Sequence, residues 1–222
     1  MQDSFRTVSL TTPAQYAEAA VLYREVFGYQ HPDYGLNPRL LGALAGNGGS
    51  VVGVLDETDR LVAFAYGFCG TDGRGFYHYS QSAVVAAGQQ GRGLGRRLKH
   101  AQREVALGSG MTRMRWTYDP FQIRNGHFNL DVLGARGRWY LPDMYGPGID
   151  RVVVEWDLER ETREPGPEVA TQLVLPAEIT DEVRREGRAS FVELFGKSLA
   201  AVSCRRLPDG TAVYDFAGAD DA

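Results

Sequence analysis

The segment that most restricts the fold of this chain runs from an apolar strand through a glycine-rich turn into a helix, at residues 82–110. It reads SAVVAAGQQGRGLGRRLKHAQREVALGSG. The start of a helix normally attracts acidic residues, because its unpaired backbone N–H groups carry partial positive charge. Here it carries four cations instead, Arg92, Arg96, Arg97 and Lys99. Glycines that expose backbone N–H groups, with arginines beside them, predict a site for an anion such as a phosphate group.

Two common phosphate-binding motifs can be tested by their spacing. A Walker loop needs G-x-x-x-x-G-K-[ST], and no Lys-Ser or Lys-Thr follows these glycines. A dinucleotide-binding fingerprint needs G-x-G-x-x-G after the first strand of a parallel sheet, whereas Gly91, Gly93 and Gly95 alternate here. The strands before them are joined by short turns, which makes neighbours antiparallel. Both motifs are therefore excluded.

The hydrophobic pattern and the turn residues predict an alternation of strands and helices. Strands are expected at residues 5–10, 50–57, 61–70, 75–85, 112–119, 136–146, 150–158, 199–206 and 211–216. Helices are expected at residues 13–28, 39–49, 93–107, 120–134 and 178–196. This order predicts an α+β fold built on a large sheet.

The first helix has the clearest boundaries. Thr12 is expected to cap it, Pro13 to occupy its first position and Gly28 to end it. Its inner face is predicted from spacings of three and four residues, at Tyr16, Ala20, Tyr23 and Phe27. In the helix after the glycine turn, the same spacing selects Leu94, Leu98, Ala101 and Val105.

Composition narrows the class of protein. The 222 residues are 43% hydrophobic and 23% charged, as in ordinary globular proteins, and the net charge of −4 argues against a nucleic-acid-binding protein. Cys69 and Cys204 stand alone, so no metal site is expected, while a disulfide between them stays open. We expect no secretory signal and no membrane helix, and therefore a cytoplasmic protein without membrane or nucleic-acid partners.

The turn itself, Gln90-Gly91-Arg92-Gly93-Leu94-Gly95, reads Q-x-x-G-x-G. It resembles the pyrophosphate-binding signature of the GNAT acetyltransferases, [QR]-x-x-G-x-[GA], and the predicted order of elements at residues 5–157 is similar to that family. The segments WTYDP and RNGHFNLDVLG also resemble a bacterial and archaeal branch of the family with W-T-x-D-P and R-N-x-x-F-N-x-x-x-L-G. The resemblance implies a GNAT fold for residues 1–157.

The remainder of the chain is interpreted as a linker and an extension. Residues 158–168 are charged and contain prolines, which is typical of a linker. Residues 169–222 are predicted to form a small C-terminal α/β extension. Because this segment is too short for a large core of its own, it is expected to pack on the main domain or on a second copy of the chain, which leaves a homodimer open.

The resemblance implies acetyl-CoA, or another acyl-CoA, as co-substrate. Backbone N–H groups of the turn would hold its pyrophosphate, and the strand before the turn would pair with its pantetheine arm. A backbone N–H near Val84 or Val85 would face the thioester oxygen. The predicted cofactor-binding residues are Val84, Val85, Ala86, Gln90, Gly91, Arg92, Gly93, Leu94, Gly95, Arg96, Asn125 and Asn129.

The acid and base of the reaction are less clear. Many GNAT enzymes have a tyrosine four residues before the glycine that ends the fourth helix, but counting back from Gly134 gives Leu130. The candidates that remain for catalysis are Asp119, Tyr140 and Tyr145. Each has a structural alternative: Asp119 as the cap of the next helix, and the tyrosines in ordinary packing.

Two pairs of other residues are candidates for contact with a ligand or for proton transfer. Asn125 and Asn129, one helical turn apart, could share a face or lie at the surface. His78 and His127 titrate in the right range but stand isolated, as structural or exposed histidines do.

The resemblance implies an acyl-CoA-dependent N-acyltransferase that transfers an acetyl group to a small amine or amino acid-like molecule by direct attack in a ternary complex. The alternative is a non-catalytic GNAT-like module that binds coenzyme A or serves in assembly. The absent tyrosine keeps this alternative open.

Overall fold

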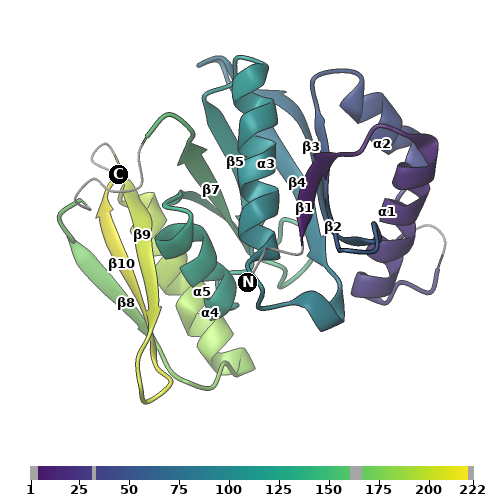
Figure 1. The fold of residues 1–222 in the computed structure, drawn as a ribbon. Coiled ribbons are helices and arrows are strands. Elements are labelled where there is room, and N and C mark those ends of the chain that lie inside the picture. Colours follow the sequence, from purple (N-terminus) through teal and green to yellow (C-terminus); the bar gives the residue numbers. More distant parts are fainter. Residues whose placement is uncertain (1–4, 32–33, 161–166, 220–222) are drawn as a thin grey trace. The chain divides into compact units, whose positions relative to one another are not determined.

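The structure, a computed structural model, describes residues 5–31, 34–160 and 167–219 (Figure 1). Contacts between residues divide the chain into two compact units, residues 1–114 and 115–222. No helix in the described ranges is long and apolar enough to cross a membrane.

The first unit is a four-stranded sheet with helices. Its elements are β1 (Arg6–Ser9), α1 (Pro13–Phe27), α2 (Pro38–Ala45), β2 (Ser50–Leu55), β3 (Leu61–Thr71), β4 (Phe76–Val85) and α3 (Leu94–Gly108). The strands follow in the order β1-β2-β3-β4, and each pairs with the next in antiparallel direction. The joints between β2, β3 and β4 are short, as their turn sequences predicted.

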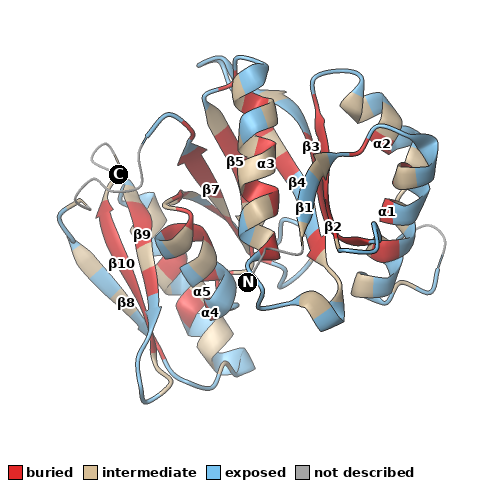
Figure 2. Cartoon of the chain, in the orientation of Figure 1, coloured by how far each residue is buried: buried red, intermediate tan, exposed pale blue. Residues whose placement is uncertain are grey.

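Helices cover both faces of this sheet, so β2 is buried at every position (Figure 2). Because side chains alternate along a strand, Val51 and Leu55 pack with α1 and α2, whereas Val52 and Val54 pack with α3. Two hydrophobic clusters result, one on each face.

Helix α1 has the predicted boundaries and an inner face that differs in part from the predicted one. Thr12 caps it, Pro13 begins it, and Gly28 ends it in the left-handed conformation at φ 67°. Its buried residues are Tyr16, Ala19 and Leu22, while Phe27 is exposed. The predicted face is therefore right in part: Tyr23 is partly buried against the same core as Tyr16, whereas Phe27 is exposed.

The second unit contains a longer sheet. Its elements are β5 (Arg113–Tyr118), which begins at the boundary, α4 (Ile123–His127), a π-helical turn (Phe128–Val132), β6 (Arg136–Leu141), β7 (Arg151–Asp157), β8 (Thr171–Leu175), α5 (Asp181–Gly196), β9 (Leu199–Arg206) and β10 (Ala212–Gly218). The strand order is β5-β7-β6-β9-β10-β8. Strand β9 pairs with β6 through Gly137 and Ala201, so residues 199–218 continue the sheet of this unit.

Helix α5 packs on this sheet through an aromatic cluster. The Phe191 ring is stacked on Tyr140 at 5.5 Å between centroids and meets Tyr214 edge-on at 5.3 Å. Phe191 and Tyr214 are fully buried. Such aromatic pairs add about 1 kcal/mol each beyond the area they bury.

Two sequence expectations differ in this unit. The helix predicted at 120–134 begins at Ile123, because Asp119 closes a turn first, and its second half is π-helical. Tyr145 lies in the turn after β6, which ends at Leu141. Cys69 of the first unit and Cys204 of the second are free thiols, so the disulfide that the sequence left open is not formed.

The α+β fold class is confirmed by these elements. The predicted linker at 158–168 lies in part outside the described residues, which omit 161–166. The domain division at residue 157 stays a prediction.

Candidate functional site

The turn between β4 and α3 is open on the side where a ligand would approach. β4 ends at Val85, and a short 3-10 turn at Ala87–Gln89 leads to the glycines. Gly91 and Gly93 have φ of 78° and 77°, in the left-handed region that favours glycine. A Cβ placed on either residue would meet no atom within 4 Å. The backbone of the turn is therefore accessible without obstruction.

The start of α3 has unused hydrogen-bond donors. Gly93 is the N-cap residue, and no side chain caps the helix. The Gly93 carbonyl accepts from Arg96 N at 3.1 Å and from Arg97 N at 3.2 Å. The N–H groups of Leu94 and Gly95 come before the first intrahelical bond, so they are free to bind an anion together with the positive end of the helix dipole.

The arginines around the turn have different roles. The Arg92 guanidinium lies 4.7 Å from the centre of the Phe5 ring and donates to Gln89 Oε1 at 2.7 Å. Arg97 Nη1 donates to the Phe5 carbonyl at 3.3 Å. Arg96 is exposed. Arg92 and Arg97 thus brace the turn against Phe5, and Arg96 keeps its charge in solvent beside it.

Lys99 does not belong to this positive end. It is buried, its Nζ donates to Ser80 Oγ at 2.8 Å, and burial lowers its pKa well below the usual value of 10.5. The sequence prediction that placed it with the arginines is wrong. Residue 99 lies more than one helical turn after the start of α3, on the face of the helix that packs on the sheet.

Lys99 is part of a buried polar network between α3 and the sheet. Ser80 Oγ donates to Gln102 Oε1 at 2.7 Å, and Gln102 Nε2 donates to Ser50 Oγ at 3.0 Å. His78 Nε2 lies 2.9 Å from Ser50 Oγ. Burial, and then the charge of Lys99, lowers the pKa of His78 to about 4. His78 is therefore a neutral structural group rather than an exposed one.

The pairing of β4 distinguishes its last residues. Ala86 N donates to the Val62 carbonyl at 2.9 Å, and Val84 and Val85 lie opposite Phe64 and Ala63 on β3. Because backbone N–H groups alternate along an antiparallel strand, Val84 N–H is directed toward β3 like that of Ala86. The N–H of Val85 is directed away from β3, to the other side of β4.

In the second unit, Asp119 holds a turn. Its Oδ1 accepts from Phe121 N at 2.9 Å, and its Oδ2 lies 3.5 Å from Arg184 Nη1 on α5. The Arg184 guanidinium also covers the Phe121 ring at 4.9 Å. Asp119 therefore closes a turn before α4, whose N-cap position is occupied by Gln122 without a side-chain cap, so the helix-capping role given as its alternative is wrong.

Asn125 and Asn129 do not share a face. Asn125 is exposed, whereas Asn129 is 3% exposed and its Oδ1 accepts from Trp116 Nε1 at 3.0 Å. The π-helical turn that begins at Phe128 adds about one residue per turn, which changes the direction of the residues after it. The shared face that an α-helical spacing predicted is therefore wrong.

Tyr140 and Tyr145 lie in different surroundings. The Tyr140 hydroxyl donates to Asp150 Oδ2 at 2.5 Å, and its pKa is raised by burial and by that carboxylate. Asp150 also accepts from Asp143 N at 2.9 Å and lies 3.4 Å from Arg188. Tyr145 is half-exposed and stacks with the guanidinium of Arg151 at 5.3 Å. Only Tyr145 presents its side chain to solvent.

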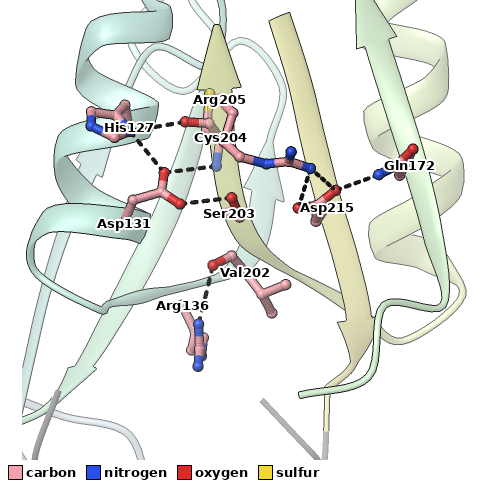
Figure 3. A network of polar contacts seen from close by, with 9 residues as sticks. All are labelled: His127, Asp131, Arg136, Gln172, Val202, Ser203, Cys204, Arg205 and Asp215. Carbon is pink, nitrogen blue, oxygen red and sulfur yellow. Dashed lines mark hydrogen bonds and ion pairs between the residues drawn. The ribbon is translucent and has the colours of Figure 1, made fainter. Parts of the chain in front are cut away.

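A further polar network surrounds β9 (Figure 3). Asp131 accepts from Ser203 Oγ at 2.7 Å and from Cys204 N at 3.0 Å, and His127 Nδ1 lies 3.1 Å from it. Asp215 accepts from Arg205 Nη2 at 2.8 Å. Sequence reasoning treated His127 as isolated, because its partners are more than 70 residues away except for Asp131 at the i+4 position. That spacing was the one signal that could have found the pair.

The described residues contain no group of three or more His, Cys, Asp or Glu side chains that could hold a metal ion.

Comparison with known proteins identifies the fold. No family model matches the sequence, and no curated protein matches it. Solved structures do match. An acetyltransferase of the GNAT family from Streptococcus pneumoniae is 15% identical at a TM-score of 0.56, over 68% of this chain and 98% of that chain. The fold is that of the GNAT acetyltransferases.

Two other solved structures are also similar to this chain. A protein from Salmonella typhimurium that is taken to be an acetyltransferase, solved with its cofactor acetyl-CoA, is 16% identical at a TM-score of 0.60, over 73% of this chain and 99% of that chain. A ribosomal-protein-S5-alanine acetyltransferase from Vibrio fischeri is 11% identical at 0.59, over 74% of this chain and 98% of that chain. At these identities the likeness concerns the fold.

Proposed function

We propose that this protein is an acyl-CoA-dependent N-acyltransferase that transfers an acetyl group from acetyl-CoA to a small amine or amino acid-like acceptor. The observation that carries the proposal is the open glycine turn at the uncapped start of α3. The GNAT fold supports it, and so does the acetyl-CoA held by the similar Salmonella structure.

The turn suits a diphosphate on three grounds. Gly91 and Gly93 leave open space where other residues would have a Cβ, and the N–H groups of Leu94 and Gly95 have no intrahelical acceptor. The dipole of a 15-residue helix and the exposed charge of Arg96 add attraction. Backbone donors of residues 90–95 would therefore hold the pyrophosphate of an acyl-CoA, and Arg96 would pair with it.

The end of β4 supplies the next contact. Backbone N–H and C=O groups at the end of a strand can pair with an extended ligand through hydrogen bonds, as an added strand would. Val84 and Val85 are the two candidates for contact with the thioester oxygen. Val85 is favoured, because its N–H is directed away from β3. We propose that Val85 N–H stabilises the negative charge that develops on this oxygen.

A thioester supplies an acyl group already activated for attack by an amine. The chain must then accept a proton from the acceptor's ammonium group, and a proton donor can assist the leaving sulfur. Asp119 and Tyr140 are engaged with Arg184 and Asp150. We therefore rank the half-exposed Tyr145 above both as the residue that exchanges a proton with substrate.

One observation favours a second candidate function. Leu130, at the position where many GNAT enzymes have a tyrosine, is 2% exposed and has no ionisable group. A protein that binds coenzyme A without turnover, for sensing or assembly, would have no need of that tyrosine.

Thermal unfolding with acetyl-CoA and longer acyl-CoAs separates these candidates. A ligand at one hundred times its Kd stabilises the folded state by about 2.7 kcal/mol, which gives a shift of several degrees. Thiol release should then be measured over a panel of amines. Stabilisation with release supports the enzyme, stabilisation without release on any amine supports the second candidate, and no stabilisation by any CoA contradicts both.

A matched pair of variants tests the position of the phosphate site. Gly93 and Gly110 lie at opposite ends of α3, with φ of 77° and 76° and no atom within 4 Å of an added Cβ. An alanine at either position therefore has a similar backbone strain, of roughly 1 kcal/mol. We expect Gly93→Ala to weaken acetyl-CoA binding at least about tenfold and Gly110→Ala to leave it unchanged. Equal affinities in the two variants would place the phosphate elsewhere.

A further inference from the structure

A hollow of about 760 Å³ lies within the second unit, beside α4. Its walls come from the start of α4, from Ile179 just before α5, and from the end of β9 with Leu207 after it. Its volume falls in the range of about 300 to 1,000 Å³ that is typical of small-molecule sites. The glycine turn of the first unit has no part in it.

The hollow is lined by cations and by no acidic side chain among the described residues. The cations are Arg124, Arg205 and Arg206, with His127 beside them. Arg205 is already paired with Asp215, which accepts from its Nη2 at 2.8 Å. For Arg124 and Arg206, residues 5–31, 34–160 and 167–219 provide no ion-pair partner. Two positive charges thus face the hollow unbalanced, in a chain whose net charge is −4.

The His127 ring is fixed in one orientation (Figure 3). Its Nδ1 lies 3.1 Å from Asp131 Oδ2 and 3.2 Å from the Cys204 carbonyl. Both neighbours are acceptors, so Nδ1 carries the hydrogen. Nε2 is therefore the ring atom left to face a ligand. Asp131 is held in turn by the backbone of Cys204, which makes this orientation rigid.

The rest of the wall is apolar. Phe121, Ile123, Ile179 and Leu207 line it. Phe121 and Ile123 are largely buried, while Leu207 keeps 38% of its surface exposed. A ligand that covered Leu207 would gain about 25 cal/mol for each Å² of apolar surface removed from water.

We propose that this hollow binds a small molecule in which an oxyanion, a carboxylate or a phosphate, is attached to an apolar group. Arg124 and Arg206 bind the oxyanion, since guanidinium groups match the geometry of both anions. The apolar group packs on Phe121, Ile179 and Leu207. This proposal goes beyond the acyltransferase function and does not depend on it.

Isothermal titration calorimetry of the full chain tests the proposal with four probes. These are 4-phenylbutyrate, its neutral amide, phenyl phosphate and inorganic phosphate. We expect saturable binding of 4-phenylbutyrate, phenyl phosphate or both, and the stronger of the two identifies the anion. The neutral amide and inorganic phosphate should each bind at least about tenfold more weakly, because each lacks one half of the ligand.

The double variant Arg124→Gln/Arg206→Gln locates the site. Both side chains are exposed, so the variant should fold, which circular dichroism checks. It should weaken binding of the better probe at least about tenfold. The matched variant Arg185→Gln, which removes an exposed arginine of α5 outside the hollow, should leave binding unchanged.

Several results would overturn the proposal. No saturable binding of either anionic probe, equal binding of the neutral amide, or undiminished binding by the double variant would each do so. Displacement of the bound probe by acetyl-CoA would show that the hollow belongs to the coenzyme instead. Loss of acetyl-CoA binding with the probe still bound would contradict the proposed function but leave this proposal standing.

Discussion

Acidification should destabilise this protein through His78. The ring is fully buried, and burial with the charge of Lys99 lowers its pKa from 6.5 to about 4. Between these two pH values the unfolded chain binds a proton at His78 and the folded chain does not. Each pKa unit corresponds to about 1.4 kcal/mol, so this histidine alone removes about 2 kcal/mol at pH 5 and about 3 kcal/mol at pH 4.

The direction of the effect follows from the lowered pKa. The contribution of His78 to stability is complete above pH 6.5 and is lost as the pH falls toward about 4. Urea unfolding, followed by circular dichroism, should be measured across this range for the wild type and for His78→Gln. Glutamine can keep the bond to Ser50 but does not titrate. We expect the free energy of unfolding to fall more steeply for the wild type, by about 2 kcal/mol at pH 5.

A control separates this effect from general acid sensitivity. His127→Gln also removes one histidine, from a position whose side chain is 55% exposed. This variant should keep the loss of stability that depends on His78, because its buried ring is unchanged. If the free energy of unfolding depended on pH in the same way for the wild type and His78→Gln, the buried ring would be protonated without cost. The predicted effect of His78 on stability would then be wrong.

Two further predictions concern packing and charge in the second unit and are checked by urea unfolding. Gly126→Ala should lower the free energy of unfolding by about 2 kcal/mol, because the added Cβ would lie 2.5 Å from a buried tyrosine hydroxyl. As a control, Gly88→Ala, whose Cβ would have no atom within 4 Å, should stay within about 0.5 kcal/mol of the wild type. Equal effects of the two substitutions would refute the packing argument. Glu155→Gln should lower the free energy of unfolding by about 3 kcal/mol, because the buried guanidinium of Arg115, which donates to Glu155 at 2.6 Å, would lose this carboxylate. A loss below about 1 kcal/mol would show that water solvates the charge of Arg115.

Local chemistry made much of the fold predictable. The boundaries of α1 follow from the capping side chain of Thr12, the fixed φ of Pro13 and the left-handed conformation of Gly28, and all three operate within a few residues. The turn at residues 90–95 was predictable for the same reason. Its glycines are needed where the chain adopts a positive φ, whatever packs around it.

Burial of polar residues was not predictable in this way. Lys99 and Gln102 interrupt the apolar stripe of α3, and a sequence pattern assigns such residues to the solvent. Their partners Ser80 and Ser50 lie 19 and 52 residues away, on two different strands. Only the assembled sheet brings these hydroxyls under the helix, so the burial follows from tertiary structure.

The fourth helix shows a second limit. Sequence periodicity assumes 3.6 residues per turn, but Leu133 N donates to the Phe128 carbonyl, five residues back. The residue one turn before Gly134 is then Asn129 as much as Leu130. Both are buried, and neither can act as an acid. The absence of the tyrosine does not depend on how the turn is counted.

An enzyme without this tyrosine can still work, because the leaving sulfur depends less on gaining a proton than the attacking amine depends on losing one. A thiol has a pKa of about 8.5 and leaves readily as a thiolate, whereas an alkylammonium, at about 10.4, must lose a proton before the nitrogen attacks. We therefore expect kcat/KM for thiol release to rise with pH and to show no descending limb at high pH. A bell-shaped profile would contradict this expectation. Two variants would then identify the acid. If the descending limb disappeared in Tyr145→Phe and remained in Tyr140→Phe, whose hydroxyl is bound to Asp150, the acid would be Tyr145.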